Sequence, residues 1–328
     1  MRDLIQATAE RMASIKAELE RRIALKGGNS YYVPTSLLGT DSTKMIKGMK
    51  FGWTTYVLYM SPYRLNSKGL NLCPKATAGC VKSCLFTSGR GSFQSVEVAR
   101  FNKAEFFVLD KQKFMDKLVK DIQTIVKRHD KLTEEGTKKY TKKFAIRLNG
   151  TSDIDWELIK IDSQEGKNIF EVFPNVQFYD YTKIPSRMQR AKVYPNYFVT
   201  FSVSEHNGKV AEKILNDGNT IAKVYFPEIP KFDFNREVYD GDESDLVFTY
   251  QGIKNVDSLV IGLYLKVPKT TKEMISEFIK SSLESGFVHI VVDGKVVPNT
   301  KENIEAAVNE FLDGKTSKNK VKEVLELV

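Results

Sequence analysis

The sequence is poor in cysteine, histidine and tryptophan, with three, three and two of these residues among 328. No apolar run approaches the roughly 18 residues that a membrane-spanning helix needs. Acidic residues occupy the N-terminal stretch in which a secretory signal peptide would have its apolar segment. We therefore expect no membrane segment and a protein of a reducing cytoplasm, where free thiols persist.

Several signatures of well-known chemistries are also missing. The sequence has no Walker-type phosphate loop, no dinucleotide-binding glycine fingerprint and no serine-nucleophile elbow. The odd number of cysteines argues against a disulfide framework, because one sulfur would stay unpaired. These absences direct attention to the cysteines that are present.

All three cysteines fall in one stretch, LCPKATAGCVKSCLFTSGRGSF, at residues 72–93. Six residues separate Cys73 from Cys80, and three separate Cys80 from Cys84. If the segment from Cys80 onward is helical, Cys80 and Cys84 lie one turn apart on one face. Pro74 and Gly79 would allow the chain to loop back and bring Cys73 alongside. Three thiolates without a fourth would leave one position of a shared metal centre open.

Three interpretations of this stretch stay open. A [4Fe-4S] cluster held by three cysteines leaves one iron free for a substrate or cofactor, and we favour it because the chain has no other cysteine. A zinc ion would need a fourth ligand, for which His206 and His289 are candidates. Alternatively, the cysteines are buried core residues that act as small hydrophobic side chains.

The net charge of +9 and the isoelectric point near 9.1 permit an acidic partner such as a nucleotide or nucleic acid. Much of the surplus lies in the lysine-rich segment 127–143. We expect that segment to be a solvated helix end and loop, because lysine-rich faces are commonly ordinary surface.

Short apolar strands alternate with helical stretches from residue 143 onward, which predicts an α/β fold, most economically a partial or complete β/α barrel. We expect an N-terminal amphipathic helix and connector at 1–36, an α/β core with the cysteine site at 37–290, and a small helical extension at 291–328. Ser92 is the expected cap of a helix after the cysteines. The terminal helices are candidates for homo-oligomer contacts. The expected strands are 53–60, 144–148, 176–179, 197–201, 221–226, 246–248, 259–265 and 287–292.

Polar residues follow several predicted strands, at the ends where chemistry collects in α/β sheets. The aspartates among them could hydrogen-bond ribose hydroxyls, and the cations could pair with a carboxylate or phosphate. An acidic run at 240–245 is a weaker candidate for Mg²⁺. The expected cofactor or substrate contacts are Arg147, Asn149, Ser152, Asp153, Tyr179, Asp180 and Lys183.

Several stretches together resemble the phage gene-product-88 family, which occurs in mycobacteriophages and other tailed phages. They lie within residues 37–290, and the resemblance implies ancestry and a host-cell cytoplasm, without an activity. The matching stretches are NLCPKATAGCVKSCLFTSGRGSF, RLNGTSDIDWE, FYDYTK, FVTFSVSE and VYDGDESDLV.

More distantly, three clustered cysteines ahead of a TIM-barrel-like core are similar to radical S-adenosylmethionine enzymes. Their usual spacing has three and then two intervening residues, where this chain has six and then three. The similarity implies a [4Fe-4S] cluster, S-adenosylmethionine as a second cofactor, and a radical or redox enzyme acting on a nucleotide, nucleic acid or other small substrate. The alternative is a metal-stabilised nucleic-acid-binding or phage accessory protein without catalysis.

Overall fold

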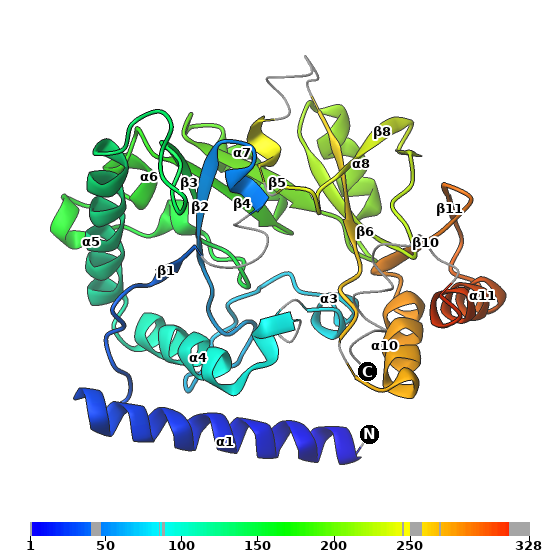
Figure 1. The fold of residues 1–328 in the computed structure, drawn as a ribbon, viewed down its shortest axis with the longest axis horizontal. Helices are drawn as coiled ribbons and strands as arrows, with labels where there is room; N and C mark the ends of the chain where they lie inside the picture. The colour runs from blue at the N-terminus through cyan, green and yellow to red at the C-terminus, as the bar shows by residue number, and fades with distance from the viewer. Residues whose placement is uncertain are drawn as a thin grey trace.

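The computed structural model describes residues 2–40, 47–84, 86, 89–244, 246–249, 258–268 and 270–314. Eleven strands within these ranges form one mostly parallel sheet with helices packed around it, so the predicted α/β class is confirmed (Figure 1). The strands are β1 (Leu38–Gly39), β2 (Trp53–Leu58), β3 (Lys143–Arg147), β4 (Gln177–Thr182), β5 (Tyr197–Ser202), β6 (Ile221–Phe226), β7 (Phe232–Asp233), β8 (Arg236–Asp240), β9 (Val260–Tyr264), β10 (Val288–Val292) and β11 (Lys295–Val297).

Helices occur along the described chain from its N-terminal end to its C-terminal end. They are α1 (Arg2–Lys26), α3 (Ala78–Lys82), α4 (Gln94–Leu109), α5 (Lys111–Asp130), α6 (Ile169–Val172), α7 (Pro185–Ala191), α8 (Gly208–Asn216), α10 (Lys272–Glu284) and α11 (Lys301–Leu312). Side-chain caps fix several helix starts: Asp110 accepts from Lys113 N in α5, and Thr271 and Thr300 do the same for α10 and α11. None of the described helices combines the length and apolar character that a membrane crossing requires.

The sheet is open among the described strands. Its order is β1-β2-β3-β4-β5-β6-β9-β8-β7, and all pairs from β2 to β8 are parallel. The short antiparallel strands β1 and β7 end the sheet, because β1 pairs with β2 alone and β7 with β8 alone. A closed barrel is therefore not shown, although the parallel β/α core that motivated it is present.

The sheet divides at β6. Strand β9 pairs with β6 from Ile221 to Tyr225 along one edge. On the other edge, β5 pairs with residues 221 and 222, and β10 then pairs with residues 224–226. Because β5 and β10 share this edge, the two strands must diverge beside the middle of β6. We call this divergence the fork.

Two of the expectations are wrong, one about a strand and one about a helix cap. Residues 246–248 were expected to form a strand, but 247–249 form a helical turn in which Thr249 N donates to Leu246 O at 2.9 Å. Local turn bonds at Ser244 and Thr249 replace strand pairing there. Ser92 does not cap α4, because its N-cap position is Phe93, without a side-chain hydrogen bond. The part of the expected extension at 291–328 that follows residue 314 lies outside the described residues.

Helix α1 packs along α4, as its predicted amphipathic pattern implies (Figure 1). Ile15, Leu19 and Ile23 recur every four residues and are buried against Val98 and Phe101 of α4. The larger core lies between strands β2–β6 and helices α4 and α5, and a separate apolar cluster joins β10, α10 and α11.

His289 of β10 lies on the face of the sheet that carries Tyr225 of β6, and Val224 lies on the other face. His289 is opposite Tyr225 in the β6–β10 register, and burial lowers the pKa of His289 to about 4. Nε2 of His289 has no hydrogen-bond partner among the described residues. The folded chain therefore favours the neutral imidazole.

We expect the contribution of His289 to the free energy of unfolding to be complete above pH 6.5, the ordinary pKa of histidine in the unfolded chain, and to be lost as the pH drops from 6.5 towards 4. This contribution is on the order of 3 kcal/mol. His289→Gln removes this titration, so urea unfolding of the variant should depend less on pH in this window. His206→Gln, at an exposed loop position, is the control. Parallel curves for wild type and His289→Gln would contradict the assignment.

Candidate functional site

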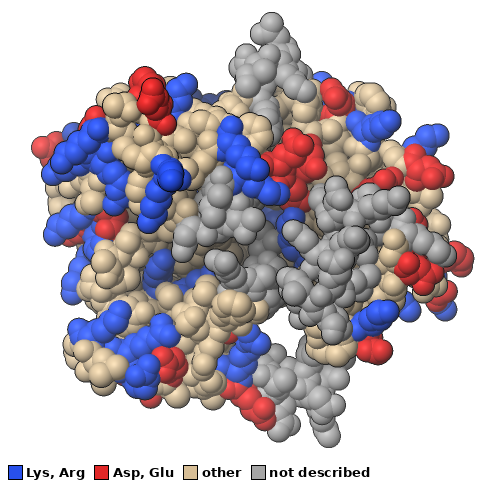
Figure 2. Space-filling model, viewed as in Figure 1, with Lys and Arg blue, Asp and Glu red and all other residues tan. Residues whose placement is uncertain are grey.

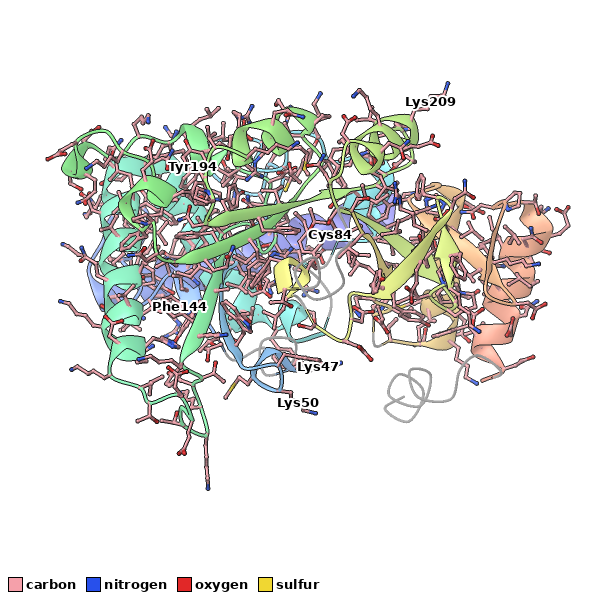
Figure 3. The ribbon with its side chains drawn as sticks, turned by 90° about the horizontal axis from the view of Figure 1, so that it is seen from above. Lys47, Lys50, Cys84, Phe144, Tyr194 and Lys209 are labelled. Atoms are coloured by element: carbon pink, nitrogen blue, oxygen red, sulfur yellow. The ribbon has the colours of Figure 1, made fainter. Side chains whose placement is uncertain are left out.

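One cavity of about 210 Å³ lies beside the fork, at the carboxyl ends of the parallel strands. All three cysteines line it, and so do residues that end β3, β4 and β5. The face seen in Figure 1 is hollowed near its centre, with Lys and Arg side chains within the hollow (Figure 2). Cys84 lies near the middle of the molecule (Figure 3).

Cys73 lies in the irregular segment after β2 and is held by backbone groups. Tyr63 N donates to Cys73 Sγ at 3.4 Å, and the thiol donates to Thr151 O at 3.6 Å. Burial raises the pKa of Cys73 to about 12, further supported by the negative charge that Cys84, Asp153 and Cys80 would carry. The thiol is therefore protonated unless a metal displaces its proton.

Cys80 lies in the short helix α3, between α4 and α10 (Figure 1). A carboxylate from the loop after β5 fixes the start of this helix: Glu205 accepts from Thr77 Oγ1 at 2.6 Å and from Gly79 N at 2.9 Å. Gly79 allows close packing, since a Cβ there would lie 2.5 Å from Phe287 Cβ. Segments far apart in sequence thus set the position of Cys80.

Cys84 follows α3 and does not belong to it. The helix ends at its C-cap Ser83, so the prediction that Cys80 and Cys84 share one helical face is wrong. The cap residue contacts α10 through a 3.0 Å hydrogen bond between the hydroxyls of Ser83 and Ser282. Burial raises the pKa of Cys84, while a backbone hydrogen bond from Phe86 and the charges of Lys183 and Arg100 oppose that rise.

The three thiols share a cavity, but they are not grouped as ligands in this structure. Among the described residues, no three His, Cys, Asp or Glu side chains are placed to hold one metal ion. Neither proposed histidine ligand lines the cavity: His289 lies on the other face of the sheet, and His206 is exposed. In the acidic run, Asp242 forms an ion pair with Lys266 at 2.8 Å, and residue 245 lies outside the described ranges.

Two cations near Cys84 lack carboxylate partners among the described residues. The Arg100 guanidinium lies over the ring of Tyr59 at 4.9 Å, and its Nε is buried without a hydrogen bond. Burial lowers the pKa of Arg100. The Lys183 ammonium lies over the ring of Phe287 at 5.5 Å. Both charges act on the Cys84 thiol.

Five of the seven expected contact residues line the cavity: Arg147, Asn149, Ser152, Asp153 and Lys183. The remaining two, Tyr179 and Asp180, are buried outside its lining. Their role in binding a cofactor stays a prediction.

The polar side chains in this group differ in how many of their hydrogen-bonding groups are already occupied within the protein. Asn149 Oδ1 accepts from Ser152 Oγ at 2.8 Å and from Trp156 Nε1 at 3.0 Å, and its amide also donates to Ile154 O. This amide therefore braces its own loop. The guanidinium of Arg147 lies over the Tyr181 ring at 4.6 Å and faces the cavity.

A buried arginine that the sequence analysis did not identify supports the loop after β3, which lines the cavity. Arg187 of α7 is fully buried, and its Nη1 lies 2.6 Å from Asp153 Oδ1. It also pairs with Glu157 at 3.2 Å and donates to the Tyr197 hydroxyl. Burial raises the pKa of Asp180 to about 7, against the lowering effect of Arg187. The alternating acids at 153, 155 and 157 were the sequence signal that a buried cation was needed.

We expect Glu205→Gln to loosen the start of α3 while Glu212→Gln, an exposed position on α8, has no effect. The variant replaces a charged acceptor by a neutral one, which lowers the free energy of unfolding by about 1–2 kcal/mol. Cys80 should also react faster with a thiol reagent in the folded variant, measured by mass spectrometry. Unchanged stability and unchanged labelling would contradict this role of Glu205.

Comparisons with known proteins give a family and no closer relative. Neither the search of curated proteins nor the search of solved structures gave a match. Nothing found supports the predicted similarity to radical S-adenosylmethionine enzymes. The family model described as "Gene product 88" matches residues 36–259, which include the three cysteines and the polar wall of the cavity. The chain belongs to the Gene product 88 family.

Proposed function

We propose that the cavity is a metal centre in which Cys73, Cys80 and Cys84 hold an iron–sulfur cluster, and that the protein is a redox enzyme for a small substrate bound beside it. The observation that carries the proposal is that all the cysteines of the chain line one cavity at the carboxyl ends of a parallel sheet.

The chemistry of the donor set fits such a group. Thiolates are the ligands that iron–sulfur clusters use. Three thiolates would bring negative charge into a buried place where Arg100 and Lys183 have no carboxylate partner among the described residues. The buried Nε of Arg100, which lacks a hydrogen bond, supports a missing acceptor nearby. The thiols would have to turn toward a common point, since they are not grouped in this structure.

The chain's own residues would bind and orient the substrate. When bound, a cluster supplies one-electron chemistry that protein side chains cannot perform. Arg147 and Lys183 face the same cavity and suit an acidic group of the substrate. S-adenosylmethionine, a nucleotide and a nucleic-acid end are the candidates that carry one.

Anaerobic purification tests the metal centre. We expect a brown protein with about four iron atoms per chain and matching sulfide. Cys73→Ser, Cys80→Ser and Cys84→Ser should each lose most of the iron. Ser83→Ala is the matched control, because it changes a neighbouring cavity residue without removing a thiol.

The metal content also decides between the remaining interpretations. One zinc per chain in a colourless protein would favour the structural-metal alternative, a binding protein without catalysis. A protein without bound metal after cluster reconstitution would overturn both. If iron is present, formation of 5′-deoxyadenosine from S-adenosylmethionine and a reductant distinguishes radical chemistry from simple electron transfer.

A further inference from the structure

The charged groups of the cavity wall leave a surplus of positive charge. Three cations line the cavity, Arg147, Lys183 and Lys266, against two acids. Asp153 shares buried Arg187 with Glu157, and Asp242 pairs with Lys266 at 2.8 Å. Lys183 has no ion-pair partner among the described residues. Its backbone is fixed in place, because the Lys183 N–H donates to Asp153 Oδ2 at 2.8 Å. A wall of this kind favours an anion over a neutral ligand.

The opposite wall of the cavity is apolar, and the fork creates it. Ala222 and Val224 of β6 face the cavity, together with Leu263 of β9 and Phe287 just before β10. These side chains come from β6 itself, from β9 on its other edge, and from the residue that leads into β10, one of the two diverging strands. An apolar surface here lowers the free energy of a ligand that removes its own apolar surface from water.

We propose that the cavity binds a small organic anion, with its carboxylate or phosphate at Lys183 and an apolar body against Val224, Leu263 and Phe287. The inference rests on the proposed function in taking the thiol-lined cavity as the active site, and it names the class of substrate. The volume of about 210 Å³ exceeds that of an engineered cavity of about 150 Å³ that accommodates benzene, so an aryl or short alkyl body fits.

Lys183 is the specificity-determining residue of this arrangement. The aromatic ring of Phe287 lies beneath its ammonium and excludes water from one side, which strengthens an ion pair with the ligand. Lys183 is also the junction of the two walls, since it contacts Phe287 of the apolar wall and follows Thr182, whose hydroxyl donates to Asp153.

Matched pairs of acids and amides test the proposal by isothermal titration calorimetry on the full-length protein. The probes are 3-phenylpropionate, hexanoate, their carboxamides, phenyl phosphate, and acetate and inorganic phosphate as head groups without a body. We expect phenylpropionate or phenyl phosphate to bind at least tenfold more tightly than the matching carboxamide and than either head group alone. Lys183→Gln should remove about tenfold of that affinity and leave carboxamide binding unchanged.

Lys209→Gln is the control, because Lys209 is an exposed residue of α8 that does not line the cavity (Figure 3). Equal binding of acids and carboxamides, no effect of Lys183→Gln, or equal binding of the bare head groups would each overturn the proposal. Its failure is separable from that of the metal centre: iron content is measured on the same Lys183→Gln preparation. If iron is retained and the protein shows no preference for acids, only the proposed ligand class is contradicted. If acids are preferred and no iron is bound, only the proposed metal centre is contradicted.

Discussion

The rest of the structure depends on the edge that two strands share on β6. Backbone groups of a buried strand must be hydrogen-bonded along its whole length. Strand β5 satisfies the first residues of this edge, and β10 satisfies the last ones. Between these two pairings the neighbouring strands separate, and the space beside β6 is lined by side chains instead of backbone. The cysteine cavity lies there because the sheet has a built-in gap at that point.

Buried polar networks hold the walls of this gap in place. Arg187 neutralises acids behind the loop after β3, and Asn149 satisfies the polar groups within that loop. Glu205 ties the loop after β5 to the start of α3. A buried charge without its partner is costly, so loss of one member of these pairs would destabilise the backbone around the cavity. The fully buried Arg187 therefore acts on the site without lining it.

The two walls of the cavity have different origins along the chain. The family match at 36–259 contains the cysteines, Arg147, Asp153 and Lys183. Leu263 and Phe287 lie beyond it, in the segment that forms β9, β10 and α10. The thiols and these cations thus lie within the matched range, whereas part of the apolar wall lies outside it.

The sequence alone determined the α/β class, most strand positions and the presence of three close thiols, because alternation of apolar residues and spacing of cysteines are local properties. It also placed five of seven expected contacts in the cavity lining, since parallel strands align their carboxyl ends. Only the tertiary structure decided that α3 ends before Cys84, that Asp180 is buried outside the cavity lining, and that Arg187 and Glu205 support its walls. Those outcomes depend on contacts between residues more than 30 positions apart, such as Thr77 with Glu205 and Asp153 with Arg187, and no local pattern encodes which distant partner a side chain will meet.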